Sequence, residues 1–233
     1  AVSSVKLWSM PPAADHEPLA VTGSIDMTVR LWRLRRGQTP TLVASCDAGT
    51  WTYTAVPLGP IDDGGAFGIA SGHTGGWTGD PPVLLRLWAV DEASRVGRLV
   101  SRPQANPPYV DDPPHRRGLH AMAYDPTAGV MATVSEDGVA CWSHDAARSA
   151  GSFAAVGRSA CPCTSVPNGV RVLAGGGRPA VAVAGRYDGT RGAPLGLPLL
   201  DVASAELRVL ERLASGSSME VTDVAEIDAG SAR

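Results

Sequence analysis

The stretch that decides the fold is Thr22-Gly23-Ser24-Ile25-Asp26-Met27-Thr28-Val29-Arg30-Leu31-Trp32. It has two runs rich in β-forming residues on either side of a polar turn that contains Asp26. Such a pattern is typical of a β-hairpin. Trp32, at the end of the stretch, provides an anchor with which the rest of the chain can be compared.

Copies of this anchor recur along the chain. They are Val29-Arg30-Leu31-Trp32, Leu85-Arg86-Leu87-Trp88, Val139-Ala140-Cys141-Trp142 and Leu197-Pro198-Leu199-Leu200, the last with Leu in place of Trp. Adjacent anchors are 56, 54 and 58 residues apart, and further alternating runs lie upstream and downstream of them. We therefore expect an all-β fold built from four repeats of four short strands each. The repeats span approximately 1–47, 50–102, 115–156 and 159–213, and 218–230 resembles the first strand of a further repeat.

The composition fits this β-rich interpretation and excludes several classes of protein. The 233 residues include 27 Gly and 19 Pro, which disfavours long helices and coiled coils. Hydrophobic residues make up 44% and charged residues 18%, so the chain can bury a core and is not disordered as a whole. The net charge of -3 provides no field that attracts nucleic acid or an anionic membrane.

The cysteines give no sign of a disulfide framework or a zinc site. Of the four, only Cys161 and Cys163 lie close together, and no second pair of Cys or His stands near them in sequence. The sequence has no apolar run of about 18 residues that would span a membrane. It also has no secretory signal at its start. We expect an intracellular protein with no cofactor, no metal and no membrane insertion.

The repeats resemble WD40 repeats, which form the blades of a β-propeller. The strand, turn and strand from Thr22 to Trp32 carry the resemblance most fully, and Leu119 to Trp142 carries it with a turn one residue shorter. In this family the indole N–H of the tryptophan is accepted by a Ser or Thr on the second strand. That hydroxyl is linked to a His before the first strand, and an Asp holds the hairpin turn.

The resemblance assigns a structural hydrogen-bond network to each blade. Trp32 is expected to pair with either of two hydroxyls in the first repeat, and Trp142 likewise in the third. The second repeat lacks the turn Asp, and the fourth lacks the tryptophan. The positions of the network are Thr22, Ser24, Asp26, Trp32, Ser71, Trp88, His115, Thr133, Ser135, Asp137 and Trp142.

Ser135, His115 and an Asp are also the components of a catalytic triad. No nucleophile elbow surrounds the serine, and the spacing is that of the blade network. We therefore expect these residues to be structural and the protein not to be an enzyme.

The length of the repeats points to loops that could bind partners. Repeats of this family take about 40 to 45 residues, so the longer units here carry insertions. In a propeller, the hairpin after the second strand and the connections between blades lie on one face, where loops on a rigid scaffold concentrate binding residues. The candidates for protein binding on this face are His73, Trp77, Asp80, Tyr109, Arg116 and Arg117.

The number of repeats predicts an incomplete ring. A propeller closes by joining its last blade to its first, and the family commonly uses more than the four blades recognised here. The chain also begins with Ala1, so the natural N-terminus is expected to be missing. We expect either part of a longer propeller or one that another segment or a partner chain completes.

These features favour a non-catalytic scaffold subunit that binds other proteins within a larger assembly of the cytoplasm or nucleus, with the nuclear pore as one candidate. Two alternatives remain open. One is an RNA-binding propeller, for which Arg30, Arg33, Arg35 and Arg36 would be the cationic cluster. The other is a propeller enzyme with a site in the central channel, although no inward-pointing set of His, Asp or Glu repeats between the units.

Overall fold

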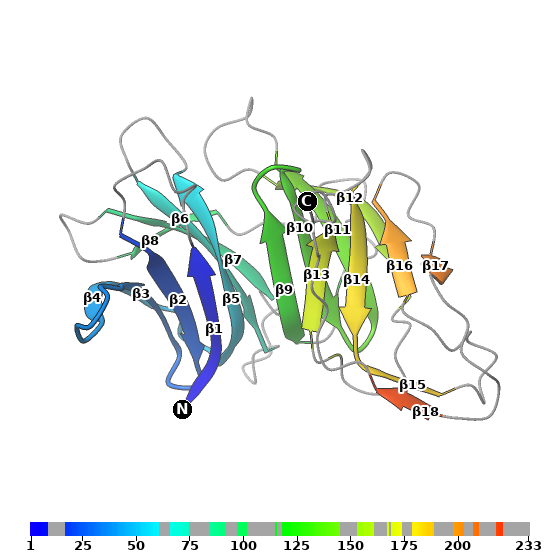
Figure 1. Cartoon of the computed structure of the whole chain (residues 1–233), viewed down its shortest axis with the longest axis horizontal. Helices are drawn as coiled ribbons and strands as arrows, with labels where there is room; N and C mark the ends of the chain where they lie inside the picture. The colour runs from blue at the N-terminus through cyan, green and yellow to red at the C-terminus, as the bar shows by residue number, and fades with distance from the viewer. Residues whose placement is uncertain are drawn as a thin grey trace, which may run out of the picture.

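The computed structural model describes residues 1–8, 17–60, 66–74, 84–91, 97–101, 115, 118–144, 153–160, 167, 169–173, 179–188, 198–202, 207–209 and 218–220. Within these ranges the chain forms strands and turns and no helix (Figure 1). The predicted all-β class is confirmed.

Sixteen strands form four antiparallel sheets of four strands each. Sheet one contains β1 (Val2–Trp8), β2 (Leu19–Ser24), β3 (Thr28–Arg33) and β4 (Thr41–Asp47). Sheet two contains β5 (Thr52–Pro60), β6 (Phe67–His73), β7 (Leu85–Val90) and β8 (Gly97–Ser101). Sheet three contains β9 (Leu119–Asp125), β10 (Val130–Ser135), β11 (Gly138–His144) and β12 (Phe153–Ser159). Sheet four contains β13 (Gly169–Leu173), β14 (Ala180–Ala184), β16 (Pro198–Asp201) and β17 (Leu207–Val209).

Two boundaries predicted for the repeats differ from the observed strands. Strand β12 continues to Ser159, so the third unit extends beyond 156 and the fourth begins later than 159. In the predicted further repeat, the described strand β18 (Ser218–Glu220) pairs with β15 (Arg186–Asp188), which follows β14 directly. These two strands make a separate two-stranded sheet from an insertion of the fourth unit and a later segment.

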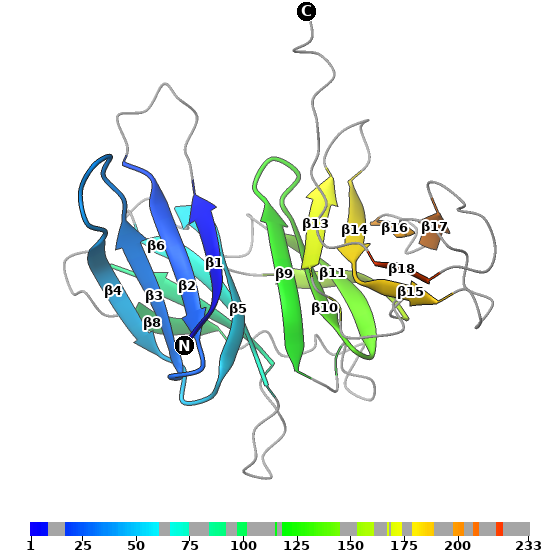
Figure 2. The same cartoon turned by 60° about the horizontal axis from the view of Figure 1, so that its bottom comes forward.

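The four large sheets stand face to face in the order of the sequence. Their first strands lie side by side, with β5 between β1 and β9, and β9 between β5 and β13 (Figures 1 and 2). Three hydrophobic cores fill the spaces between successive sheets. The core between sheets one and two includes Val21, Val29 and Leu31 with Ile69, Trp88 and Val90. The core between sheets two and three includes Ala70, Leu85 and Leu87 with Met122, Met131 and Trp142. The core between sheets three and four includes Val134, Val139 and Cys141 with Val172, Val181 and Leu200.

Each sheet has two faces, because neighbouring residues of a strand point to opposite sides. We name the side that carries Trp32, Trp88 or Trp142 the tryptophan face, and the opposite side the following face. Trp88 lies in the first core with Val21 and Leu31 from the following face of sheet one. Trp142 lies in the second core against sheet two in the same way. The tryptophan faces of sheets two and three are therefore covered by the sheet that precedes each of them.

Sheets two and three approach closely at Gly72. A Cβ atom at this position would lie 2.7 Å from Thr54 Cγ2 and 2.8 Å from Leu119 Cβ. Real Cβ atoms do not make contacts this short, so the glycine is needed for the packing of these two sheets.

Candidate functional site

A β-bulge marks the tryptophan in each of the first three sheets. The register between the third and fourth strands shifts immediately before Trp32, Trp88 and Trp142. The indole in each sheet reaches a hydroxyl on the second strand, two residues beyond the residue that it faces across the ladder. The same local geometry thus recurs three times, as the spacing in the sequence predicts.

In sheet one the indole of Trp32 is bonded to one of the two predicted hydroxyls, that of Thr22. Trp32 Nε1 donates to Thr22 Oγ1 at 2.9 Å. Ser24 Oγ instead donates to the carbonyl of Ala1 at 2.8 Å. Asp26 holds the turn, since its carboxylate accepts from the amide and the hydroxyl of Thr28 at 3.1 and 2.5 Å. These hydrogen bonds lower the pKa of Asp26 to about 2, with the hydroxyl of Thr28 as the largest cause.

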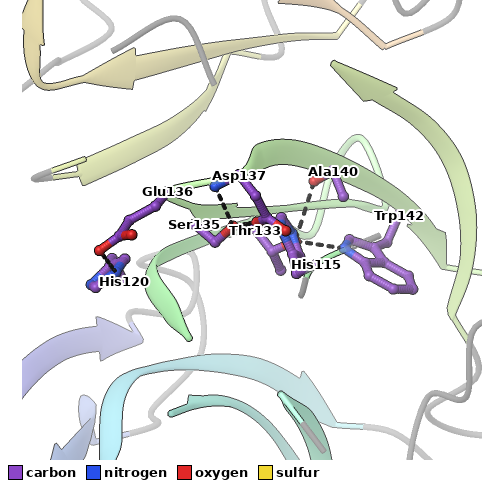
Figure 3. Close-up of polar contacts among 8 residues, drawn as sticks. All are labelled: His115, His120, Thr133, Ser135, Glu136, Asp137, Ala140 and Trp142. Carbon is purple, nitrogen blue, oxygen red and sulfur yellow. Dashed lines mark hydrogen bonds and ion pairs between the residues drawn. The ribbon is translucent and has the colours of Figure 1, made fainter. Parts of the chain in front are cut away.

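Sheet three contains the longest network (Figure 3). Trp142 Nε1 donates to Thr133 Oγ1 at 2.9 Å. His115 lies between the two hydroxyls, with Nε2 2.8 Å from Thr133 Oγ1 and Nδ1 2.9 Å from Ser135 Oγ. Ser135 Oγ donates to the carboxylate of Asp137. The predicted positions of the third repeat therefore form one connected group.

Proton counting gives a direction to the hydrogen bonds around Ser135. A serine hydroxyl has one proton, and that of Ser135 goes to Asp137, so Ser135 accepts from His115 Nδ1–H. Thr133 Oγ1 accepts the indole N–H of Trp142 and lies within hydrogen-bond distance of His115 Nε2 and of the carbonyl oxygen of Ala140. Ser135 and Thr133 are 0% exposed. The hydroxyl of Ser135 thus has a donor and an acceptor within the sheet and no exposed surface.

Sheet two has an equivalent network, in which the sequence predicted Ser71 and Trp88 but not the histidine. Trp88 Nε1 donates to Ser71 Oγ at 2.7 Å, and Ser71 lies 2.7 Å from Nε2 of His73. The other ring nitrogen, Nδ1, is 3.3 Å from Thr52 Oγ1. The histidine comes from the second strand itself and not from the segment before the first strand, which is why the family spacing does not find it.

His73 is therefore not the surface contact that we expected. Its side chain is 0% exposed and lies within the sheet. Burial, followed by the charge of Arg86, lowers the pKa of His73 to about 3. The prediction that it binds a partner is wrong because its ring nitrogens are committed to Ser71 and Thr52.

The remaining predicted contacts, Trp77, Asp80, Tyr109, Arg116 and Arg117, lie outside the described residues. The described structure instead draws attention to exposed apolar residues at the end of the sheets that carries the β2–β3 and β10–β11 turns. We name this the turn end. Ile25 and Met27 in the first turn are 43% and 42% exposed, and Trp51, just before β5, is 42% exposed.

Met27 is held in an unusual conformation at the turn end. Its φ is 68°, in the left-handed region that residues with a Cβ rarely adopt. Its amide donates to the carbonyl of Ser24 at 3.2 Å, and its carbonyl accepts from Ala48 at 2.7 Å. The backbone bonds on both sides therefore fix a strained residue whose apolar side chain faces solvent.

A second group at the turn end joins sheets two and three. The rings of Tyr53 and His120 are stacked, with centroids 5.7 Å apart and planes at 14°. His120 Nε2 lies 3.8 Å from a carboxylate oxygen of Glu136 (Figure 3). Burial lowers the pKa of His120, while the charge of Glu136 opposes that shift. The group is partly exposed and combines aromatic and acidic character.

The described residues offer no centre for metal or thiol chemistry. No group of three His, Cys, Asp or Glu in these ranges could hold a metal ion. Cys46 and Cys141 are buried, and desolvation raises the pKa of each thiol to about 12, which keeps both protonated. The described part of the chain contains no helix that is long and apolar enough to cross a membrane.

Comparisons with other proteins add no assignment. Neither the known protein families nor the curated proteins that were compared give a match to this chain.

Proposed function

We propose that this chain is a WD40-type propeller subunit that binds other proteins within an assembly and catalyses no reaction. The exposed residues Ile25, Met27 and Trp51 carry the proposal. They stand on turns that internal networks hold in place, so little conformational freedom is lost when a partner binds. Large apolar and aromatic side chains of this kind provide most of the binding energy at protein interfaces.

The WD40 assignment is supported by the repeated geometry of the first three sheets. Each combines a bulge before the tryptophan with an indole bonded to a hydroxyl two residues along, and the tryptophans of sheets two and three also pack on the preceding sheet. The two networks with a histidine use the ring as a link between hydroxyls. Such networks specify the arrangement of strands within a sheet and leave turns free for binding.

Three of the four arginines considered for RNA binding, Arg30, Arg33 and Arg35, have acidic partners. Arg30 Nη2 lies 2.9 Å from a carboxylate oxygen of Asp26. Arg33 Nε lies 3.2 Å from Glu17, and Arg35 is paired with the same carboxylate. These pairs lower the positive charge that the cluster presents to phosphates, so protein binding is favoured over binding of RNA.

The proposal is tested by affinity purification from the source cells with variants of the turn end. Trp51→Ser combined with Met27→Gly removes both side chains, and glycine also relieves the left-handed strain. We expect the proteins that accompany the wild type to be recovered at least tenfold less with this variant, at an unchanged or higher melting temperature. Val156→Ser is the matched control, because Val156 is also 42% exposed but lies in β12. Equal recovery with both variants, or no stable companion of the wild type, would refute the proposal.

A further inference from the structure

The tryptophan face of sheet one is the exception to the packing of the other sheets. The ladder places Leu7 opposite Ala20, Ala20 opposite Trp32, and Trp32 opposite Leu42. Directly opposed residues lie on the same face of a sheet, so these four form one row across it. Leu7 is 68% exposed and Leu42 is 45% exposed.

The equivalent rows of sheets two and three are buried at their centres. In sheet two, Ile69 and Trp88 are opposed and are 0% and 4% exposed. In sheet three, Met131 and Trp142 are opposed and are 0% and 3% exposed. The preceding sheet covers each of these rows with aliphatic side chains of its following face. The structure thus shows twice what kind of surface covers a tryptophan face.

A second row adds to the open surface of sheet one. Val5 lies opposite Thr22, and Thr22 lies opposite Arg30. Val5 is 58% exposed, while Arg30 is paired with Asp26 at the turn. The face therefore offers apolar area with its one cation already neutralised, which suits an uncharged apolar partner surface.

Sheet four of a second copy does not suit this position. Val181 and Val183 of β14 point toward sheet three, so Ala182 and Ala184 lie on the following face of sheet four. Both alanines are already buried, at 0% and 1% exposed. The described residues also form no extensive contact between sheets one and four. Sheet four, of this chain or of a copy, thus does not provide the cover for sheet one.

We propose that the tryptophan face of sheet one docks a four-stranded antiparallel β-sheet of a partner protein, which presents a face of Val and Leu side chains. The partner sheet takes the place that sheet one occupies on sheet two and that sheet two occupies on sheet three. Docking buries Leu7, Leu42 and Val5 and completes the enclosure of Trp32. The surface is distinct from the turn end, so either proposal can fail without the other.

Site-specific photo-crosslinking in the source cells tests this proposal. The full chain carries benzoylphenylalanine in place of Leu7, and a control chain carries it in place of Val156. We expect position 7 to give adducts to one other protein. The linked residue should lie on a strand of alternating apolar and polar residues, and position 156 should not give this adduct. A Val5→Glu substitution should abolish the adduct and leave the melting temperature unchanged, because Val5 is exposed in the chain alone.

Each other result overturns the proposal. Adducts between two copies of this chain would assign the face to self-association, and adducts to lipid would assign it to a membrane surface. Adducts to a helix or loop of a partner would contradict the sheet chemistry. Absence of any adduct, together with acrylamide quenching of Trp32 fluorescence that is equal in the assembly and in the purified chain, would show that the face stays open.

Discussion

Mild acid should destabilise this protein through His73. The pKa of its buried ring is about 3, whereas that of an exposed imidazole is 6.5. A histidine with a lowered folded pKa contributes stability that is complete above pH 6.5. That contribution is lost as the pH falls from 6.5 toward 3, because only the unfolded chain takes up the proton.

The magnitude follows from the two pKa values. Between pH 7.5 and pH 5 protonation stabilises the unfolded histidine by the equivalent of about 1.5 pKa units, while the folded ring stays unprotonated. At about 1.4 kcal/mol per unit, the free energy of unfolding should fall by about 2 kcal/mol. This is a large share of the stability of a typical domain.

Urea denaturation at a series of pH values measures this dependence. His73→Gln keeps hydrogen-bonding groups but cannot titrate, so its free energy of unfolding should fall by about 2 kcal/mol less than that of the wild type between pH 7.5 and pH 5. The control is His120→Gln, which alters a ring that is 21% exposed and should leave most of the slope in place. If His73→Gln keeps the wild-type slope, the ring is not buried in the neutral state and the assignment of its network fails.

The networks, the packing and the turn of sheet one give three further predictions. Ser71→Ala leaves the buried indole N–H of Trp88 and Nε2 of His73 without their partner and should lower the free energy of unfolding by about 2 kcal/mol or more. Thr22→Ala should cost about 1 kcal/mol, because water reaches the partly exposed indole of Trp32, and chemical denaturation compares the two variants. Gly72→Ala should cost about 1 to 3 kcal/mol by forcing sheets two and three apart, while Gly169→Ala, whose Cβ would lie 3.7 Å from its nearest neighbour, should be tolerated in the same assay. Asp26→Asn should remove stability that the wild type holds above about pH 4 and loses between pH 4 and 2, so melting curves of the two proteins should converge as the pH approaches 2; parallel curves over that range would contradict this role for the carboxylate.

The spacing of the tryptophans was enough to predict the class of fold and most of the internal bonds. Trp88 and Ser71, or Trp142 and Thr133, are brought together by a hairpin, and a hairpin is local in sequence. The sequence does not decide between Thr22 and Ser24 as the acceptor for Trp32, because this depends on the bulge and on the register of the strands.

Other features depend on contacts that the sequence pattern does not specify. His73 follows a strand of small residues and looks like the start of a loop, yet hydrogen bonds to Ser71 and Thr52 draw it into the sheet. The alternation of β1 predicts a strand but not that Val5 and Leu7 remain exposed, since this is decided by what stands on the far side of the sheet. The late end of β12 at Ser159 reflects pairing with β11, which extends past the apolar run.

The way in which the sheets cover one another makes this chain a directional stack. Each core combines side chains from two successive units, so no unit can bury its apolar surface alone, and stability is shared between nearest neighbours. During synthesis, the following face of sheet one stays unprotected until Ile69 and Trp88 have left the ribosome. Chain growth and core formation therefore proceed in the same direction. A truncation between two units would leave the aliphatic following face of the last remaining sheet exposed to solvent.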